Sequence, residues 1–339
     1  MVWIVNIILL ALGIVVGVLI VVVLLHLMSP YPSASLIKVI FDRPYPIGDA
    51  VGLAKASEQV DVITDTHYPS KYRRNKLDIY TPTQHISPTP VPVMIWVHGG
   101  GFVGGNKSQL KEFGTLLANQ SQVAVVTVNY DLAPHSAYPQ QLKQLDEAYR
   151  YLLGDKMLGE KLDFSQLMFG GDSAGAQIAA QYLAVQTNAN YAREMSMEQL
   201  VNPADLKGFV SYCGPLDLKQ MLTLPTKQLI VSFLYTTIAR SLIGTRKWQE
   251  RPELKQASIV DFVTHDFPAS FITDGNTYSF ESQGQVFVER LTQLNVPVTP
   301  LFFTDNSKKV IHEYQFLYDT QEGQLCLSQT IAFIQECLN

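Results

Sequence analysis

The residue best placed for covalent chemistry in this sequence is Ser173, in a Gly-Asp-Ser-Ala-Gly pentapeptide at 171–175. A short apolar run at 167–170 precedes the pentapeptide, and apolar residues with helical spacing follow it. In a strand-to-helix turn of this kind, the glycines let the backbone turn sharply and expose the serine as a nucleophile at the edge of a sheet. A plain turn in which Ser173 caps a helix would carry the same pentapeptide. The motif alone therefore leaves both interpretations open.

A His-Gly-Gly-Gly-Phe segment at 98–102 directly follows a second apolar run at 93–97. An oxyanion that forms during acyl transfer needs backbone N–H donors that approach without side chains in the way. The three glycines can provide such donors, and Ala174, the residue after the serine, can add another. The sequence thus predicts an oxyanion hole beside Ser173.

The same loop formally matches two nucleotide-binding motifs. Its glycine spacing fits the dinucleotide fingerprint, but Asn129 stands at the end of the next strand, where that fingerprint needs an acid. A phosphate-binding loop would need a glycine where Asn106 stands. We therefore expect no nucleotide cofactor, and no other cofactor.

The general base should be a histidine near the carboxyl end of the chain. Where the serine lies on a strand-to-helix elbow, the acid and then the base follow it in sequence. Of the seven histidines only His265 and His312 follow Ser173, and His265 precedes the strand expected to carry the acid. We predict that His312 is the base. Glu313 follows it, but the sequence there does not complete a His-Glu-x-x-His zinc motif.

The acid should lie in the loop after the strand predicted at 270–273. Asp274 and Glu281 are the carboxylates of that loop. We favour Asp274, because a Gly-Asn turn at the end of the strand could direct it toward His312. Asp274 could instead only cap an Asx-type turn, and Glu281 could complement the dipole of a following helix. A triad without an acid also stays open.

The composition excludes several classes of protein. The chain has 339 residues with a formal charge of −5, so it lacks the basic surface that nucleic-acid binding requires. Only 16% of its residues are charged, which argues against disorder and points to a membrane segment. The three cysteines, Cys213, Cys326 and Cys337, show no metal-binding spacing, and we expect ordinary thiols in a reduced setting.

Strands and helices alternate from Val60 onward, which is typical of an α/β fold with a mostly parallel sheet and helices on both faces. Two edge strands are predicted at 60–65 and 76–80. The further predicted strands are 93–97, 123–129, 167–170, 209–213, 270–273 and 298–303. Helices are predicted at 110–119, 140–153, 174–185, 280–294 and 324–338. Residues 215–265 interrupt the alternation, and we interpret them as a helical cap insertion over the sheet within one domain at 60–339.

The amino end predicts a membrane anchor. Residues 2–28 contain no Asp, Glu, Lys or Arg, and the unbroken apolar stretch 7–25 would span roughly 28 Å as a helix. A cleaved signal peptide is the alternative, but its charged start and shorter apolar core are missing. We therefore predict a single-pass transmembrane helix at 1–28, followed by a stalk or an amino-terminal cap segment at 29–59. The first charge, Lys38, favours a cytoplasmic catalytic domain at the cell membrane.

Taken together, the motifs resemble those of the hormone-sensitive-lipase-like branch of the α/β-hydrolase esterases. The resemblance covers roughly residues 60–339 and rests on an ordered set of segments: 77–82, 98–102, 129–134, 170–175 and His312. It implies an α/β-hydrolase fold in which Ser173 is the nucleophile, His312 the base, and Gly100, Gly101 and Ala174 the oxyanion hole. Two departures are visible: Asp131 replaces the usual arginine, and Thr277 and Tyr278 stand where the family has its acid.

We therefore expect a membrane-anchored serine hydrolase that cleaves carboxylic esters through an acyl-enzyme. Its partners would be a small-molecule ester and the lipid bilayer, and not nucleic acid. A hydrolase fold that only binds a ligand, or a serine peptidase on the same fold, are the alternatives. The apolar residues around Phe233, Leu234, Tyr235 and Ile238 suit either an apolar substrate group or plain packing.

Overall fold

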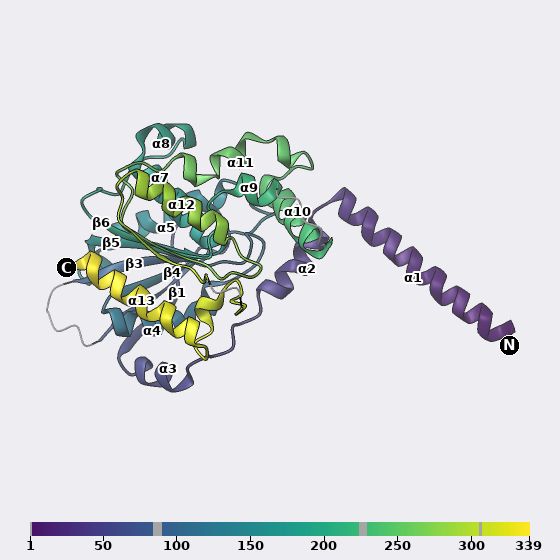
Figure 1. The fold of residues 1–339 in the computed structure, drawn as a ribbon, viewed down its shortest axis with the longest axis horizontal. Coiled ribbons are helices and arrows are strands. Elements are labelled where there is room, and N and C mark those ends of the chain that lie inside the picture. Colours follow the sequence, from purple (N-terminus) through teal and green to yellow (C-terminus); the bar gives the residue numbers. More distant parts are fainter. Residues whose placement is uncertain (1, 84–89, 224–228, 305–306) are drawn as a thin grey trace.

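A computed structural model describes residues 2–83, 90–223, 229–304 and 307–339 (Figure 1). Its centre is an eight-stranded sheet with the order β1-β2-β4-β3-β5-β6-β7-β8. In chain order the strands are β1 (Val60–His67), β2 (Lys76–Pro82), β3 (Val91–Val97), β4 (Ala124–Val128), β5 (Leu162–Asp172), β6 (Leu206–Tyr212), β7 (Ser270–Thr273) and β8 (Val298–Leu301). Each predicted strand is present, with ends that differ by a few residues.

Strands β3 to β8 are parallel, whereas β1 and β2 are antiparallel to their neighbours. The prediction that 76–80 forms an edge strand is wrong, because β2 lies between β1 and β4. Most of β2 is buried, while β1 exposes most of its residues and forms the edge. Since the parallel strands share one direction, their carboxyl ends gather the loops after β3, β5, β6 and β7 at one edge.

Helices cover both faces of the sheet, as predicted (Figure 1). On one face lie α4 (Lys111–Ser121) and α13 (Gln321–Leu338), and on the other α5 (Gln140–Gly154), α7 (Ala174–Thr187) and α12 (Glu281–Gln293). Shorter elements complete the domain: α6 (Lys156–Gly159), α8 (Ala189–Met195), η1 (Lys107–Leu110), η2 (Trp248–Glu250), η3 (Ile259–Asp261) and η4 (Tyr314–Phe316). Their apolar faces and the sheet enclose two hydrophobic cores.

Asp131 lies buried in the loop after β4. Its carboxylate accepts hydrogen bonds from the Leu132 amide and the Ser136 hydroxyl, at 3.1 and 2.7 Å. These bonds satisfy both carboxylate oxygens locally, so the buried aspartate at the position of the family's arginine is accommodated by hydrogen bonding.

The amino-terminal residues form three helices, α1 (Val2–Met28), α2 (Tyr31–Phe41) and α3 (Ala50–Ser57). Figure 1 shows α1 projecting away from the body of the molecule, while α2 packs against the cap. Among the helices as far as the structure describes them, none is long and apolar enough to span a membrane. The predicted transmembrane helix therefore has no support from the described residues.

The predicted insertion at 215–265 contains α9 (Leu218–Thr223), α10 (Leu229–Ile243) and α11 (Pro252–Gln256). Residues 224–228 of this insertion lie outside the described part of the chain. Helix α10 packs against α2, so the amino-terminal segment and the insertion meet at the base of α1 (Figure 1).

Candidate active site

Ser173 occupies a strained turn between β5 and α7. Its backbone has φ 48° and ψ −117°, a conformation that a residue with a side chain rarely adopts. Two glycines permit the turn: a Cβ on Gly171 would lie 2.4 Å from the carbonyl carbon of Gly175, and one on Gly175 would lie 2.0 Å from the Val97 carbonyl oxygen. The interpretation of 171–175 as an elbow, rather than a plain helix cap, agrees with this geometry, since the Ser173 side chain makes no capping hydrogen bond.

His312 lies directly beside this serine. Its Nε2 atom is 3.0 Å from the Ser173 Oγ, within hydrogen-bond distance. A bridge between Ile311 and Thr277, and a 3.1 Å bond from the His312 amide to the Thr277 carbonyl, hold the loop that carries the ring. His265, by contrast, is an exposed residue paired with Asp266. The structure thus brings the predicted base and nucleophile together.

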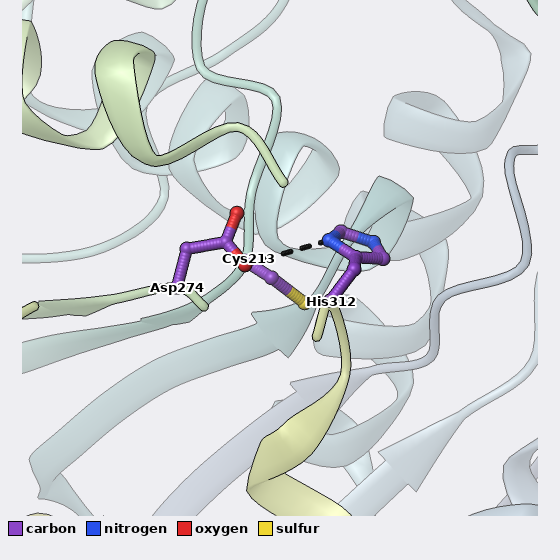
Figure 2. Close-up of side chains that lie close together, drawn as sticks. All are labelled: Cys213, Asp274 and His312. Atoms are coloured by element: carbon purple, nitrogen blue, oxygen red, sulfur yellow. Dashed lines mark ion pairs between the residues drawn. The ribbon is translucent and has the colours of Figure 1, made fainter. Parts of the chain in front are cut away.

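Asp274 approaches the other ring nitrogen of His312. Figure 2 shows this carboxylate facing the ring, with Asp274 Oδ1 3.5 Å from Nδ1. This distance is longer than a good hydrogen bond, and within the described residues Nδ1 has no hydrogen-bond partner. The same carboxylate accepts the amides of Gly275 and Phe280, each at 2.7 Å. Asp274 therefore caps its loop and also faces the histidine, so the two interpretations of this residue are compatible.

Glu281, the other candidate acid, begins α12 and accepts a hydrogen bond from Gln285 at 3.2 Å. Within the described part of the chain it makes no ion pair with His312. The two residues at the family's acid position do not replace it: Tyr278 is 72% exposed, and Thr277 serves the bridge to Ile311. Asp274 is the carboxylate that the fold places behind the histidine.

The electrostatics of His312 favour its protonated form. Burial alone would lower the pKa of the ring, but Asp274, followed by Glu313 and Asp172, more than offsets this and raises the pKa above its ordinary value. A base with a raised pKa holds a proton firmly while an acyl group is transferred.

The glycine loop at 98–102 lies beside Ser173, as predicted. Gly100 and Gly101 have φ of 106° and 57°, and a Cβ on Gly100 would lie 2.3 Å from the Gly104 carbonyl oxygen. Among the described residues, the Gly100 and Gly101 amides donate no hydrogen bond, and Ala174 opens α7, where helix N–H groups have no internal partner. These are the three amides predicted for the oxyanion hole.

Asp172 fixes the beginning of this loop. Its carboxylate accepts the Gly99 amide at 2.7 Å and the Trp96 indole N–H at 2.8 Å. Burial, and then the charge of Glu313, raise its pKa well above the ordinary value. Asp172 belongs to the pentapeptide at 171–175, but no role was predicted for it from the sequence. Its position between Gly171 and the predicted nucleophile Ser173 is the signal that could have indicated a role for it.

Glu313, the residue after His312, also lies in the site. Its Oε1 is 3.8 Å from His312 Nε2, and the Tyr45 hydroxyl donates to its Oε2 at 3.2 Å. The backbone of Glu313 has a φ of 66°, in the left-handed region that favours glycine. In the sequence, Glu313 drew attention only as part of a possible zinc motif, and nothing in the local pattern indicated that its carboxylate lies in the site.

Cys213 packs beside Asp274 and His312 (Figure 2). The three side chains offer possible metal-ligand atoms within 4.8 Å of one another. Burial, and then the nearby carboxylates, raise the pKa of the Cys213 thiol well above its ordinary value, so it stays protonated. Both Asp274 oxygens already accept backbone amides. A metal here would have to displace the thiol proton and compete with those amides for the carboxylate, so this cluster is a poor metal site.

Two cavities meet at Ser173 and His312. The main cavity, of about 550 Å³, is lined largely by apolar side chains, among them Phe41, Leu234, Tyr235, Ile238 and Phe280. The second cavity, of about 280 Å³, contains more polar groups, among them Arg43, Tyr45, Gln109, Asp172 and Glu313. The hydroxyl of Ser173 is thus accessible from an apolar space large enough for a small organic molecule.

Residues 94–315 match the family described as the alpha/beta hydrolase fold. An esterase of Pyrobaculum calidifontis superposes with a TM-score of 0.65 at 20% identity, covering 89% of this chain and 92% of that one. Esterase B of Lactobacillus rhamnosis gives 0.68 at 18% identity, covering 90% and 92%. Esterase LipW of Mycobacterium marinum gives 0.65 at 21% identity, covering 85% and 84%. At these identities the superpositions establish a shared fold.

Proposed function

Because this chain belongs to the alpha/beta hydrolase fold family, we propose that it is a carboxylic-ester hydrolase of the hormone-sensitive-lipase-like branch. The observation that carries the proposal is the 3.0 Å contact between Ser173 Oγ and His312 Nε2. The serine lies on an elbow where its backbone φ is positive, at 48°. The superposed esterases share this fold, which supports the same reaction class.

The proposed reaction begins when His312 Nε2 accepts the proton of the Ser173 hydroxyl. The serine oxygen then attacks the ester carbonyl carbon, and the carbonyl oxygen becomes an oxyanion that the amides of Gly100, Gly101 and Ala174 stabilise. His312 returns the proton to the departing alcohol, which leaves an acyl group on Ser173. Water then attacks this acyl group, with His312 as its base, and the carboxylic acid departs.

In this mechanism Asp274 orients and stabilises the ring of His312. A carboxylate behind the base favours the tautomer in which Nε2 can accept a proton, and it stabilises the imidazolium that forms. The 3.5 Å separation between Asp274 Oδ1 and His312 Nδ1 is compatible with this role, because catalytic hydrogen bonds often tighten only when the substrate binds.

The main cavity supports esters with an apolar group as substrates. Leu234 and Ile238 of α10 line it together with Phe41 at the end of α2. Burying an apolar acyl or alcohol group there would contribute about 25 cal/mol for each Å² removed from water. We therefore expect the enzyme to prefer esters with an acyl group longer than acetate.

The test is hydrolysis of p-nitrophenyl butyrate by the full chain. We expect turnover by the wild type, and loss of at least about 10³-fold in Ser173→Ala, whose fold should be unchanged. Ser165→Ala, at an exposed serine of β5, is the matched control and should retain full activity. Equal activity in wild type and Ser173→Ala would contradict the proposal.

We also propose that α1 anchors the enzyme to a lipid bilayer. The support comes from the amino-acid sequence, in which residues 2–28 contain no Asp, Glu, Lys or Arg. The described apolar side chains of α1, such as Leu10 and Ile14, are mostly exposed along a helix that leaves the body (Figure 1). Exposed apolar residues of this density have no favourable contact in water.

Vesicle flotation of the detergent-purified full chain tests this anchor. We expect the wild type to float with phosphatidylcholine vesicles after detergent removal. Arginine at both Leu12 and Val16 should release it, since each charge at the centre of a helix disfavours insertion by about 2.5–3.5 kcal/mol. Val51→Arg, at an exposed position of α3, is the control and should float. A wild type that stays in the aqueous fraction would overturn the anchor.

A further inference from the structure

Glu313 combines several unfavourable features in one residue. Its φ of 66° lies in the left-handed region, its side chain is only 18% exposed, and it lies beside the buried Asp172. A Cβ on Gly99 would lie 2.4 Å from Asp172 Oδ2 and 3.2 Å from Glu313 Oε1, so both carboxylates border the same point of the glycine loop. Glycine would avoid the strain and the charge. Residues held in such conformations are often functional.

The two oxygens of Glu313 have different surroundings. Oε2 accepts the hydroxyl of Tyr45 at 3.2 Å, which holds the carboxylate in one orientation. Oε1 lies 3.8 Å from His312 Nε2, the nitrogen that contacts Ser173 Oγ. This separation is too long for a direct hydrogen bond. It admits one water molecule at about 2.8 Å from each atom.

The second cavity provides the room for that water. Glu313, His312 and Ser173 all line it, and its volume of about 280 Å³ exceeds the ~30 Å³ that one water occupies. The main cavity is lined largely by apolar side chains, so it can hold the apolar group of the substrate at the same time. A water molecule in the second cavity would therefore reach the acyl group on Ser173 without displacing the apolar group from the main cavity.

We propose that Glu313 binds the hydrolytic water and presents it to His312 during deacylation. The inference rests on the proposed esterase function. In the step, His312 Nε2 takes one proton from the water held by Glu313 Oε1, and the water oxygen forms a bond to the acyl carbonyl carbon. The tetrahedral intermediate then expels Ser173 Oγ, which regains the proton from Nε2, and the carboxylic acid is released.

Glu313 acts in this scheme after the alcohol has left. Glu313 also raises the pKa of His312, so the two half-reactions are compared at a pH above that pKa, where the ring is neutral with or without Glu313. Under that condition the loss of Glu313 should slow deacylation and leave acylation nearly unchanged. A water held less well also competes less well with another nucleophile, so an added alcohol should capture more of the acyl-enzyme. A residue that only supported the loop would alter both half-reactions, because His312 serves both.

The experiment measures both half-reactions of the full-length protein with p-nitrophenyl acetate. Rapid-quench measurements give the acylation rate, and intact-protein mass spectrometry gives the amount of acyl-enzyme and the rate of its decay. With added methanol, the ratio of methyl acetate to acetate shows how the acyl-enzyme partitions between methanol and water. For Glu313→Gly we expect deacylation to fall about 10- to 100-fold, acylation to stay within about twofold, and the methanol product to rise. Glu313→Gln, which keeps a polar oxygen, should show the same pattern more weakly.

Two further variants sharpen the result. Tyr45→Phe removes the hydroxyl that orients Glu313 and should move the partition in the same direction by a smaller factor. Glu281→Gln changes a glutamate that, among the described residues, is hydrogen-bonded to Gln285 and makes no ion pair with His312, and it should leave both rates within about twofold. Thermal melts establish that each variant is folded. Glycine adopts the left-handed backbone conformation of position 313 readily, so Glu313→Gly should not strain the backbone.

An unchanged partition ratio in folded Glu313→Gly would overturn the role of Glu313, as would an equal fall of acylation and deacylation. Absence of any acylation in the wild type is a different result. It would overturn the proposed esterase function itself.

Discussion

The hydroxyl of Ser173 and the Nε2 of His312 lie 3.0 Å apart, although 139 positions separate the two residues in sequence. The contact arises because parallel strands deliver their loops to one edge of the sheet. Strand β5 carries the serine, and the loop after β8 carries the histidine.

Removal of the Asp274 charge should slow the enzyme without unfolding it. Asp274→Asn keeps an oxygen for one of the two loop amides but no longer stabilises the imidazolium of His312, so we expect kcat to fall about 10²- to 10⁴-fold. Glu281→Gln should change kcat by less than about threefold. Steady-state kinetics on a small aryl ester measures both, and the reverse pattern would identify Glu281 as the acid.

The activity should depend on pH through His312. The ring must be neutral to accept the serine proton, and the neighbouring carboxylates raise its pKa above 6.5. The kcat/KM should therefore rise with pH through a midpoint above 6.5 in the wild type. In Asp274→Asn the midpoint should move to lower pH. A midpoint that the substitution leaves unmoved would show that Asp274 does not act on this ring.

The elbow should not tolerate a side chain at Gly175. A Cβ there would lie 2.0 Å from the Val97 carbonyl oxygen, and neither backbone can move freely. We expect Gly175→Ala to lower the free energy of unfolding by about 3 kcal/mol or more in urea denaturation. Gly159→Ala, where no atom lies within 4 Å of the new Cβ, is the control and should be neutral or slightly stabilising. Equal stabilities would contradict the tight elbow.

The main cavity should set the length of the acyl group. Leu234→Trp would fill part of the 550 Å³ space, so kcat/KM should fall for p-nitrophenyl octanoate by about tenfold and change little for the acetate. An acyl-length series on wild type and variant measures this. Loss of activity on every ester to the same degree would indicate damage to the catalytic residues instead.

Local patterns in the sequence were sufficient to predict most of the sheet and to select Ser173 and His312, which the fold brings into contact. Buried parallel strands are apolar on both faces, so β3 and β4 stand out as short runs of β-branched residues. The elbow and glycine loop are specified by close backbone approach, which only glycine permits, and this too is visible in sequence. Chain order alone then selects His312 over His265.

Other features depend on contacts between distant residues. Strand β2 resembles an edge strand in sequence, but pairing with β1 encloses it. The prolines within 29–59 predict a stalk or an amino-terminal cap segment, but no local pattern indicates that α2, which begins after Pro30, packs Ala34 and Ile37 into the core. Glu313 reaches the site through an unusual φ and a contact with Tyr45, 268 positions away, and no local pattern encodes either.

The most direct test of the account is labelling of the folded full chain with a serine-reactive alkyl phosphonate, followed by peptide mass spectrometry. A phosphonate of this kind forms a covalent bond to a serine oxygen that is activated as a nucleophile, so its attachment reports that activation directly. We predict one phosphonylated residue, Ser173, with labelling lost in His312→Ala and in heat-denatured protein. A folded wild type that shows no phosphonate on Ser173 would contradict the central claim that this serine is an activated nucleophile.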